Sequence, residues 1–259
     1  MTPPDVAVHA DPNILAAAVA ARLVTRLVDL QAAGNIPKLV LTGGGIGIAV
    51  LEQIRGTVAR DAVDWGHVEF YWGDERFLVD GDPERNETQA RATLLDHVRV
   101  DPAKIFPMAP DRGTGPSGAE AAATEYAELL ARQSRPEDHG PVPSFDVLLL
   151  GMGDEGHTAS VFPHSPAVYE NERTVVAVHG CPKPPPTRVS LTLPAIRRAA
   201  EVWIIATGEA KAPMVAMALA GAGETAIPVA GARGRRRTRW LLDRAAATKL
   251  PRDLMPPIA

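Results

Sequence analysis

Short apolar runs alternate with amphipathic segments along this chain, and this pattern predicts strands that alternate with helices. In residues 14–31 the apolar positions fall at helical spacing: Leu15, Val19, Leu23, Leu27 and Leu30. Asp11 and Pro12, just before this segment, are residue types typical of an N-cap and a first helical turn. Residues 38–41 predict a strand and residues 46–55 the next helix, so the two form a first strand-and-helix unit.

The remaining apolar runs continue the pattern. Further strands are predicted at residues 67–72, 146–150, 174–178, 201–206 and 239–242. Helices are predicted at residues 88–98, 118–132, 209–220 and 244–249. This order favours an α/β fold, Rossmann-like, with a mostly parallel doubly wound sheet and helices on both faces. We expect one domain over residues 1–259, with flexible ends at about 1–10 and 251–259.

Composition narrows the classes of partner. The chain has 259 residues, 46% of them hydrophobic, and a net charge of −4, which gives no overall attraction to nucleic acid or anionic membranes. We therefore expect a small-molecule partner and a monomer. The single cysteine, Cys181, excludes an internal disulfide framework. No basic leader and no apolar run of about 18 residues is present, so we expect a cytoplasmic protein.

A glycine loop joins the first strand and helix. Residues 42–47 read Thr-Gly-Gly-Gly-Ile-Gly, and we expect Gly43, Gly44 and Gly45 to bind a phosphate through backbone N–H groups at the helix start. The loop does not match the dinucleotide fingerprint, because Ile48 stands at the third glycine position. It also lacks the Gly-Lys-Ser/Thr of a P-loop. An ordinary glycine turn is the alternative.

Polar residues follow the strand at 67–72. Asp74 and Arg76 come directly after it, and the carboxyl ends of parallel strands meet at one edge, so we expect both near the glycine loop. There an acid and a guanidinium can bind a sugar hydroxyl or a phosphate, and a surface salt bridge is the alternative. Asn86 follows a turn and is expected to cap a helix, a role compatible with substrate contact.

Residues 145–163, FDVLLLGMGDEGHTASVFP, carry the clearest chemistry. A buried strand ends in two glycines, after which come Asp154, Glu155 and His157. A neutral imidazole accepts a proton from water near pH 7, and a carboxylate on its other nitrogen fixes the tautomer. We therefore predict His157 as a general base. The spacing to His164 matches no compact zinc motif, and no Gly-x-Ser-x-Gly elbow occurs, so we expect no metal and no serine nucleophile.

Two further cations complete the candidate site. Arg188 follows the proline-rich residues 179–187, whose stiff path would hold Lys183 and Arg188 beside the sheet edge, although a plain surface connector fits as well. Lys211 is expected one turn into a helix, a location suited to an anion near the helix start. The arginine run at 233–239 lacks interleaved aromatic residues, so we interpret it as a solvated connector without a nucleic-acid partner.

Taken together, these motifs resemble those of the 6-phosphogluconolactonases, in the superfamily that also holds the glucosamine-6-phosphate deaminases. The resemblance covers nearly the whole chain and is carried by GDERF, GMGDEGHTASVFP, PKPPPTRVSLTLP, ATGEAK and RWLLDRAA. It implies a Rossmann-like fold, no metal or organic cofactor, and hydrolysis of 6-phospho-D-glucono-1,5-lactone to 6-phosphogluconate, a step of the oxidative pentose phosphate pathway. The family's catalytic histidine falls on His157.

Two motifs depart from the family pattern. Gly45 replaces the serine of a usual Gly-Gly-Ser, and Glu155 replaces the aspartate of a usual Pro-Asp-Gly-His. The loss of the serine hydroxyl would leave phosphate more dependent on backbone N–H groups. The longer acid leaves open whether Glu155, Asp154 or Asp74 orients His157.

The mechanism expected from these residues is attack by water. His157 would deprotonate a water that attacks the lactone carbonyl, and backbone N–H groups of the glycine turns would stabilise the oxyanion. Asp74 would orient substrate or water. The phosphate and sugar would be held by the glycine loop, Arg76, Asn86, Arg188 and Lys211. The alternatives are an aminosugar-phosphate deaminase or isomerase, and a non-enzymatic sugar-phosphate sensor.

Overall fold

The computed structural model describes residues 5–251 and residue 254. Its centre is a parallel six-stranded sheet in the order β1-β9-β8-β5-β2-β3. The strands are β1 (Asp5–His9), β2 (Lys38–Leu41), β3 (Glu69–Trp72), β5 (Val147–Gly151), β8 (Glu201–Ala206) and β9 (Arg237–Asp243). This confirms the predicted α/β fold with a mostly parallel sheet.

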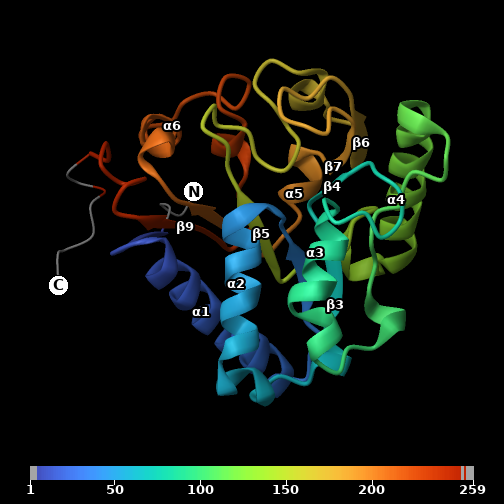
Figure 1. Ribbon diagram of the computed structural model, residues 1–259, viewed down its shortest axis with the longest axis horizontal. Coiled ribbons are helices and arrows are strands. Elements are labelled where there is room, and N and C mark those ends of the chain that lie inside the picture. Colours follow the sequence, from blue (N-terminus) through green and yellow to red (C-terminus); the bar gives the residue numbers. More distant parts are fainter. Residues whose placement is uncertain (1–4, 252–253, 255–259) are drawn as a thin grey trace.

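Helices cover both faces of this sheet. They are α1 (Pro12–Ala32), α2 (Gly44–Gly56), α3 (Asn86–Thr93), α4 (Ala119–Gln133), α5 (Leu193–Ile196) and α6 (Ala212–Leu219). In Figure 1, α1 and α2 lie side by side over one face, and α4 lies at the right edge of the view, away from both. Successive residues of β2 enter different cores: Leu39 and Leu41 pack with α1 and α2, and Val40 packs in the core that includes Tyr126 of α4. Burial on both faces explains the continuous apolar runs of the central strands.

Helix α1 begins as its sequence predicts. The Asp11 carboxylate accepts a hydrogen bond from the backbone N–H of Ile14 at 2.9 Å, and Pro12 occupies the first turn, where no N–H is needed. Three buried leucines on this helix, Leu15, Leu23 and Leu27, have no exposed surface. The helix is therefore held by both its cap and its apolar face.

A second, three-stranded antiparallel sheet stands beside the first, in the order β4-β7-β6. It consists of β4 (Asp74–Arg76), β6 (Val175–Val178) and β7 (Arg188–Leu191), and the sequence analysis missed β4 and β7. Gly73 joins the two sheets, because its N–H donates to the Leu41 carbonyl at 3.1 Å and its carbonyl accepts from Leu191 N at 2.9 Å. This sheet brings two residues far apart in sequence, Arg76 and Arg188, into register as neighbours.

The N-terminal end differs from the expectation of a flexible segment. Residues 5–9 form β1, which pairs in parallel with β9 along its whole length. The expected flexible residues 1–4, 252–253 and 255–259 lie outside the described residues. Residues 237–239 of the arginine run belong to β9 rather than to a connector.

Three helix predictions need correction. Helix α3 begins at Asn86, and its N-cap is Arg85, so Asn86 is not the cap. Residues 209–211 form a short 3-10 turn, so Lys211 precedes α6 instead of lying one turn inside a helix. Residues 244–249 are turns rather than a helix, closed by the Asp243 carboxylate, which accepts from Ala246 N at 2.7 Å. No helix within residues 5–251 is long and apolar enough to cross a membrane.

Candidate active site

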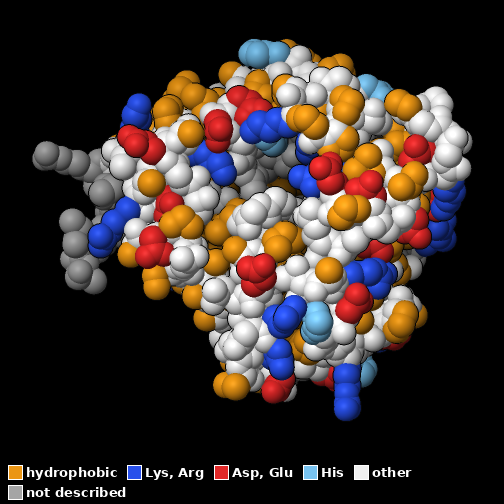
Figure 2. Space-filling model, in the orientation of Figure 1, with side chains coloured by type: hydrophobic (Ala, Val, Ile, Leu, Met, Phe, Trp, Pro, Cys, Tyr) orange, Lys and Arg blue, Asp and Glu red, His pale blue; other side chains and the backbone are white. Residues whose placement is uncertain are grey.

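A cavity of about 610 Å³ opens at the carboxyl ends of β2 and β5. After β2 the chain passes to β3 on one side, whereas β5 pairs with β2 on the other, and such a switch in strand order leaves a crevice. Figure 2 shows it as a hollow with basic and acidic side chains at its rim. The cavity is lined by every candidate site residue except Glu155: Gly43, Gly44, Gly45, Asp74, Arg76, Asn86, His157, Arg188 and Lys211.

The glycine loop places the start of α2 at this cavity. Gly43 is the N-cap and offers no side chain to cap the first turn, so the backbone N–H groups there have no side-chain acceptor. Gly44 has φ +78°, a conformation that favours glycine. A Cβ on Gly43 would overlap the Asn86 side chain. The loop is shorter than predicted, because α2 already begins at Gly44, and helix N-termini of this kind can bind an anion.

His157 sits on a tight turn directly after β5. Gly153 N donates to the His157 carbonyl at 3.0 Å, and Gly156, with φ +87°, completes the turn. The His157 Nδ1 atom lies 3.0 Å from Glu155 Oε1. The imidazole also packs against the Phe162 ring, with 4.4 Å between centroids. Glu155 therefore adjoins His157 from outside the cavity lining, whereas Asp154 lines the cavity itself.

The electrostatics favour a neutral imidazole beside an ionised carboxylate. Burial lowers the pKa of His157 from its ordinary value, and the Lys183 ammonium lowers it further, while Glu155 opposes both. Burial acts to raise the pKa of Glu155, but a hydrogen bond to its own backbone, His157 and Lys183 outweigh it and hold the pKa below its usual range. With Nδ1 beside the carboxylate, Nε2 is the nitrogen available to take a proton.

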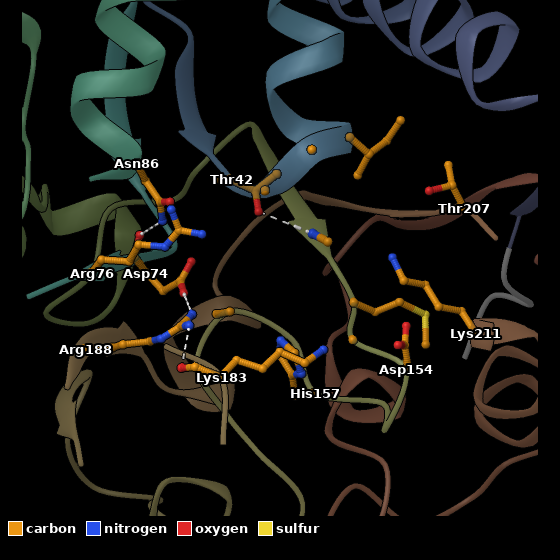
Figure 3. Close-up of a pocket in the computed structure, with 18 of the residues that line it drawn as sticks. Thr42, Asp74, Arg76, Asn86, Asp154, His157, Lys183, Arg188, Thr207 and Lys211 are labelled. Atoms are coloured by element: carbon orange, nitrogen blue, oxygen red, sulfur yellow. Dashed lines mark hydrogen bonds and ion pairs between the residues drawn. The ribbon is translucent and has the colours of Figure 1, made fainter. Parts of the chain in front are cut away.

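Arg188 and Asp74 form a second polar group, on the wall across the cavity from Lys211 (Figure 3). The buried Asp74 carboxylate accepts a hydrogen bond from Ser160 Oγ at 2.7 Å, and Arg188 Nη1 lies 3.9 Å from the same oxygen. The other nitrogens of Arg188 bind its own loop: Nε donates to Pro185 O at 3.2 Å, and Nη2 donates to Lys183 O and Pro184 O, each at 3.1 Å. Much of the hydrogen-bonding capacity of Arg188 thus fixes the proline-rich loop.

A buried carboxylate that the sequence analysis missed, Glu75, supports this wall. It accepts backbone N–H groups of Arg76 and Asn86 at 2.7 Å each and of Glu87 at 2.9 Å, and the Arg85 guanidinium lies 3.8 Å away. Burial raises the pKa of Glu75 to about 7 against these partners. Asn86 in turn donates from Nδ2 to the Asp74 carbonyl at 2.9 Å. Glu75 therefore fixes the start of α3 against β4.

Lys211 lies across the cavity from this wall, near Thr207 (Figure 3). Burial lowers the pKa of Lys211, and Asp154 is the main opposing charge. The lining residues outside the candidate set include three with polar side chains that can reach a ligand: Thr42, Lys183 and Thr207. Each had a signal in the sequence: Thr42 begins the glycine loop, Lys183 lies in the proline run before Arg188, and Thr207 lies in the ATGEAK motif. Among the described residues, no group of three or more His, Cys, Asp or Glu side chains is arranged to hold a metal ion.

Comparisons with known proteins agree with this geometry. The family model of glucosamine-6-phosphate isomerases/6-phosphogluconolactonase matches residues 10–240. The 6-phosphogluconolactonase of Streptomyces coelicolor is 58% identical over 254 residues, 98% of this chain and 97% of the relative. That of Mycobacterium tuberculosis is 49% identical over 241 residues, 93% of this chain and 96% of the relative.

Solved structures are similar over the same extent. The 6-phosphogluconolactonase of Trypanosoma brucei has a TM-score of 0.81 at 29% identity, covering 96% of this chain and 99% of that one. A monomeric glucosamine-6-phosphate deaminase shares the fold, with a TM-score of 0.76 at 18% identity over 95% of this chain and 99% of that one. The family match and the close relatives both span nearly the full length, so the chain belongs to the glucosamine-6-phosphate isomerase/6-phosphogluconolactonase family.

Proposed function

We propose that this chain hydrolyses 6-phospho-D-glucono-1,5-lactone to 6-phosphogluconate, with His157 as the general base. The observation that carries the proposal is the 3.0 Å approach of His157 Nδ1 to the Glu155 carboxylate, in a cavity that also offers Lys211 and the free start of α2. The choice of substrate is supported by the names of relatives that are 44–58% identical to this chain.

The distribution of charge in the cavity supports one orientation of the substrate. The phosphate binds the first-turn N–H groups of α2 and the Lys211 ammonium. The N–H groups have no side-chain acceptor, and among the described residues Lys211 has no ion-pair partner. The lactone ring then lies across the cavity toward Asp74, Arg76 and Asn86, whose polar atoms suit sugar hydroxyls (Figure 3). In this proposed orientation the lactone carbonyl would lie beside His157.

The reaction proceeds by addition and elimination at the lactone carbonyl. His157 Nε2 takes one proton from a water as the water oxygen bonds to the carbonyl carbon, and the carbonyl oxygen becomes an oxyanion. Glu155 stabilises the resulting imidazolium through Nδ1. When the oxyanion collapses, the bond from the carbonyl carbon to the ring oxygen breaks, and the imidazolium returns its proton to that oxygen. The new carboxylic acid ionises, so one water is consumed per lactone.

An assay with two substrates tests the proposal against its alternatives. The chain is offered the lactone and glucosamine 6-phosphate separately, and the lactone rate is corrected for uncatalysed hydrolysis. We expect turnover of the lactone alone. Turnover of glucosamine 6-phosphate would favour the deaminase or isomerase alternative, and binding without turnover of either would indicate a sugar-phosphate sensor.

Expectations about the cellular setting belong to the same proposal. A monomeric cytoplasmic protein without a nucleic-acid partner would act on a free sugar phosphate in the oxidative pentose phosphate pathway. The cavity supports the small-molecule partner alone, since its described lining supplies cations and donors for one small anionic substrate. Size-exclusion chromatography with light scattering measures the oligomeric state, and a mass of about one 27.5 kDa chain is expected.

A further inference from the structure

We infer that Lys183 contacts the substrate, holding the lactone carbonyl oxygen during attack and the carboxylate of the product afterwards. The inference rests on the proposed function, because it assigns one more contact within that reaction. It concerns a residue that lay outside the candidate site drawn from the sequence.

The Lys183 side chain lies in the cavity close to His157. Lys183 lines the cavity, and Figure 3 shows its side chain extending from the proline-rich loop toward the His157 ring. Its Nζ lies 3.4 Å from Glu155 Oε2, while His157 Nδ1 lies 3.0 Å from the other oxygen, Oε1, of the same carboxylate. One carboxylate thus holds the base and the ammonium together, so both lie beside the carbon that water attacks.

The backbone that carries Lys183 is firmly held. Arg188 donates to the carbonyl oxygens of Lys183 and of the two prolines that follow it, at 3.1–3.2 Å. Cys181 N also donates to Pro186 O at 2.9 Å, which closes the loop. Because this backbone is already fixed, the loop loses little further backbone freedom when the lysine meets an anion.

The other cations of the cavity have different tasks. Most donors of Arg188 bind its own loop, and Arg76 Nη1 donates to the Glu84 carbonyl at 2.6 Å. Lys211 serves the phosphate in the proposed placement. Within the described part of the chain, Glu155 is the one ion-pair partner found for Lys183, and the Lys183 side chain is 46% exposed. Its remaining ammonium protons are therefore available to the oxygen on which negative charge develops.

The first experiment separates a carboxylate contact from a phosphate contact. Isothermal titration calorimetry measures binding of 6-phosphogluconate and of D-glucitol 6-phosphate, which carries CH2OH in place of the carboxylate. Lys183→Met is expected to weaken 6-phosphogluconate about 10- to 100-fold and to leave D-glucitol 6-phosphate nearly unchanged. Lys211→Met is expected to weaken both. Equal weakening of both ligands by Lys183→Met, or of neither, would overturn the inference.

The second experiment measures how the charge of Lys183 affects the pKa of His157. Three charged groups act on His157: Glu155 from its own turn, Lys183 from the proline-rich loop and Asp74 from β4. Activity rises with pH as His157 loses its proton. Because the Lys183 ammonium lowers the pKa of His157, its removal raises that pKa. The acid limb of kcat/KM is therefore expected at higher pH in Lys183→Met, with kcat reduced more than KM is raised, and an unshifted limb would contradict the placement.

A matched lysine controls for loss of surface charge. Lys249 is exposed, in the turns after β9 and outside the cavity lining, so Lys249→Met is expected to retain both affinities and the pH profile.

The calorimetry does not depend on turnover, so it tests the lysine assignment separately from the proposed function. Failure of the parent chain to hydrolyse the lactone would therefore refute the proposed function, and parent-like product affinity in Lys183→Met would refute the lysine assignment.

Discussion

One methyl group at Gly153 tests whether the geometry of His157 and Glu155 matters. A Cβ at this position would overlap Nδ1 and Cε1 of His157 and Oε2 of Glu155, so both side chains must move. Phe162 packs against the imidazole at 4.4 Å between centroids and limits where the ring can go. Gly153 does not have a positive φ, so alanine fits the backbone and the effect comes from the new contact.

The expected loss of kcat follows from the rate enhancement that a general base provides. A general base contributes about 10²- to 10⁴-fold, or roughly 3–5 kcal/mol of barrier. Displacement of the imidazole by the methyl group should remove at least the lower figure, so Gly153→Ala is expected to reduce kcat about 10²-fold or more. The phosphate contacts lie on α2 and near α6, so KM should change little. Crowding in the turn should cost about 1–3 kcal/mol of stability, which leaves the protein folded.

Steady-state kinetics on the lactone, with thermal unfolding as the fold check, measures both effects. Gly56→Ala is the matched control, because a Cβ on Gly56 meets no atom within 4 Å at the far end of α2. Its kcat should equal that of the parent. A folded Gly153→Ala protein with the parent kcat would refute the claim that the imidazole and its carboxylate act in this arrangement.

Three further substitutions probe other parts of the site. Glu155→Gln removes the charge that raises the pKa of His157, so the acid limb of kcat/KM should move to lower pH while plateau kcat falls on the order of 10²-fold; a limb at the parent position would contradict the ion pair. Gly43→Ala places a methyl group on the Asn86 side chain and should raise KM about 10-fold, whereas an unchanged KM would remove Asn86 from substrate binding. Glu75→Gln should lower the free energy of unfolding in urea by about 1–3 kcal/mol, because three backbone N–H groups share that carboxylate. Burial raises the pKa of Glu75 to about 7, so the parent's stabilisation from this group is present at low pH and is lost as pH rises through 7. The deficit of the variant should therefore shrink from pH 5 to pH 8, and a deficit that grows over this range would be inconsistent with the raised pKa.

Five of the six strands of the main sheet could be predicted because they carry their own signal, whereas β1 lies in residues that were expected to be flexible. Val147 to Leu150 are all buried, since both faces of the parallel sheet are covered, and such a run is visible in the sequence. The cap of α1 is equally local, because Asp11 and Pro12 act within one turn. These features depend on neighbours close in the chain, so residue type and spacing are sufficient to predict them.

The small sheet could not be predicted in the same way. Strand β4 has three residues, two of them acidic, and it is defined by pairing with β7 more than 100 positions later. Alternation along this strand also separates adjacent acids: Asp74 lines the cavity, whereas Glu75 lies buried against the start of α3. Nothing in the residue types distinguishes these roles, so the supporting carboxylate was missed.

The roles of the two acids before His157 also could not be distinguished from the sequence. Asp154 and Glu155 precede the histidine by three and two residues, and the turn at Gly156 decides which one approaches the imidazole. Asp154 lines the cavity and acts on the pKa of Lys211, whereas Glu155 lies beside Nδ1. Lys183 approaches the same acid only because Arg188 fixes its loop from the small sheet.

The most direct test of the central claim compares lactone hydrolysis by the parent chain and by His157→Ala. Initial rates are measured near pH 7 with freshly prepared 6-phospho-D-glucono-1,5-lactone and corrected for uncatalysed hydrolysis. The account predicts that the variant stays folded, binds D-glucitol 6-phosphate as the parent does, and loses about 10²- to 10⁴-fold in kcat. A folded His157→Ala protein with the parent kcat would contradict it.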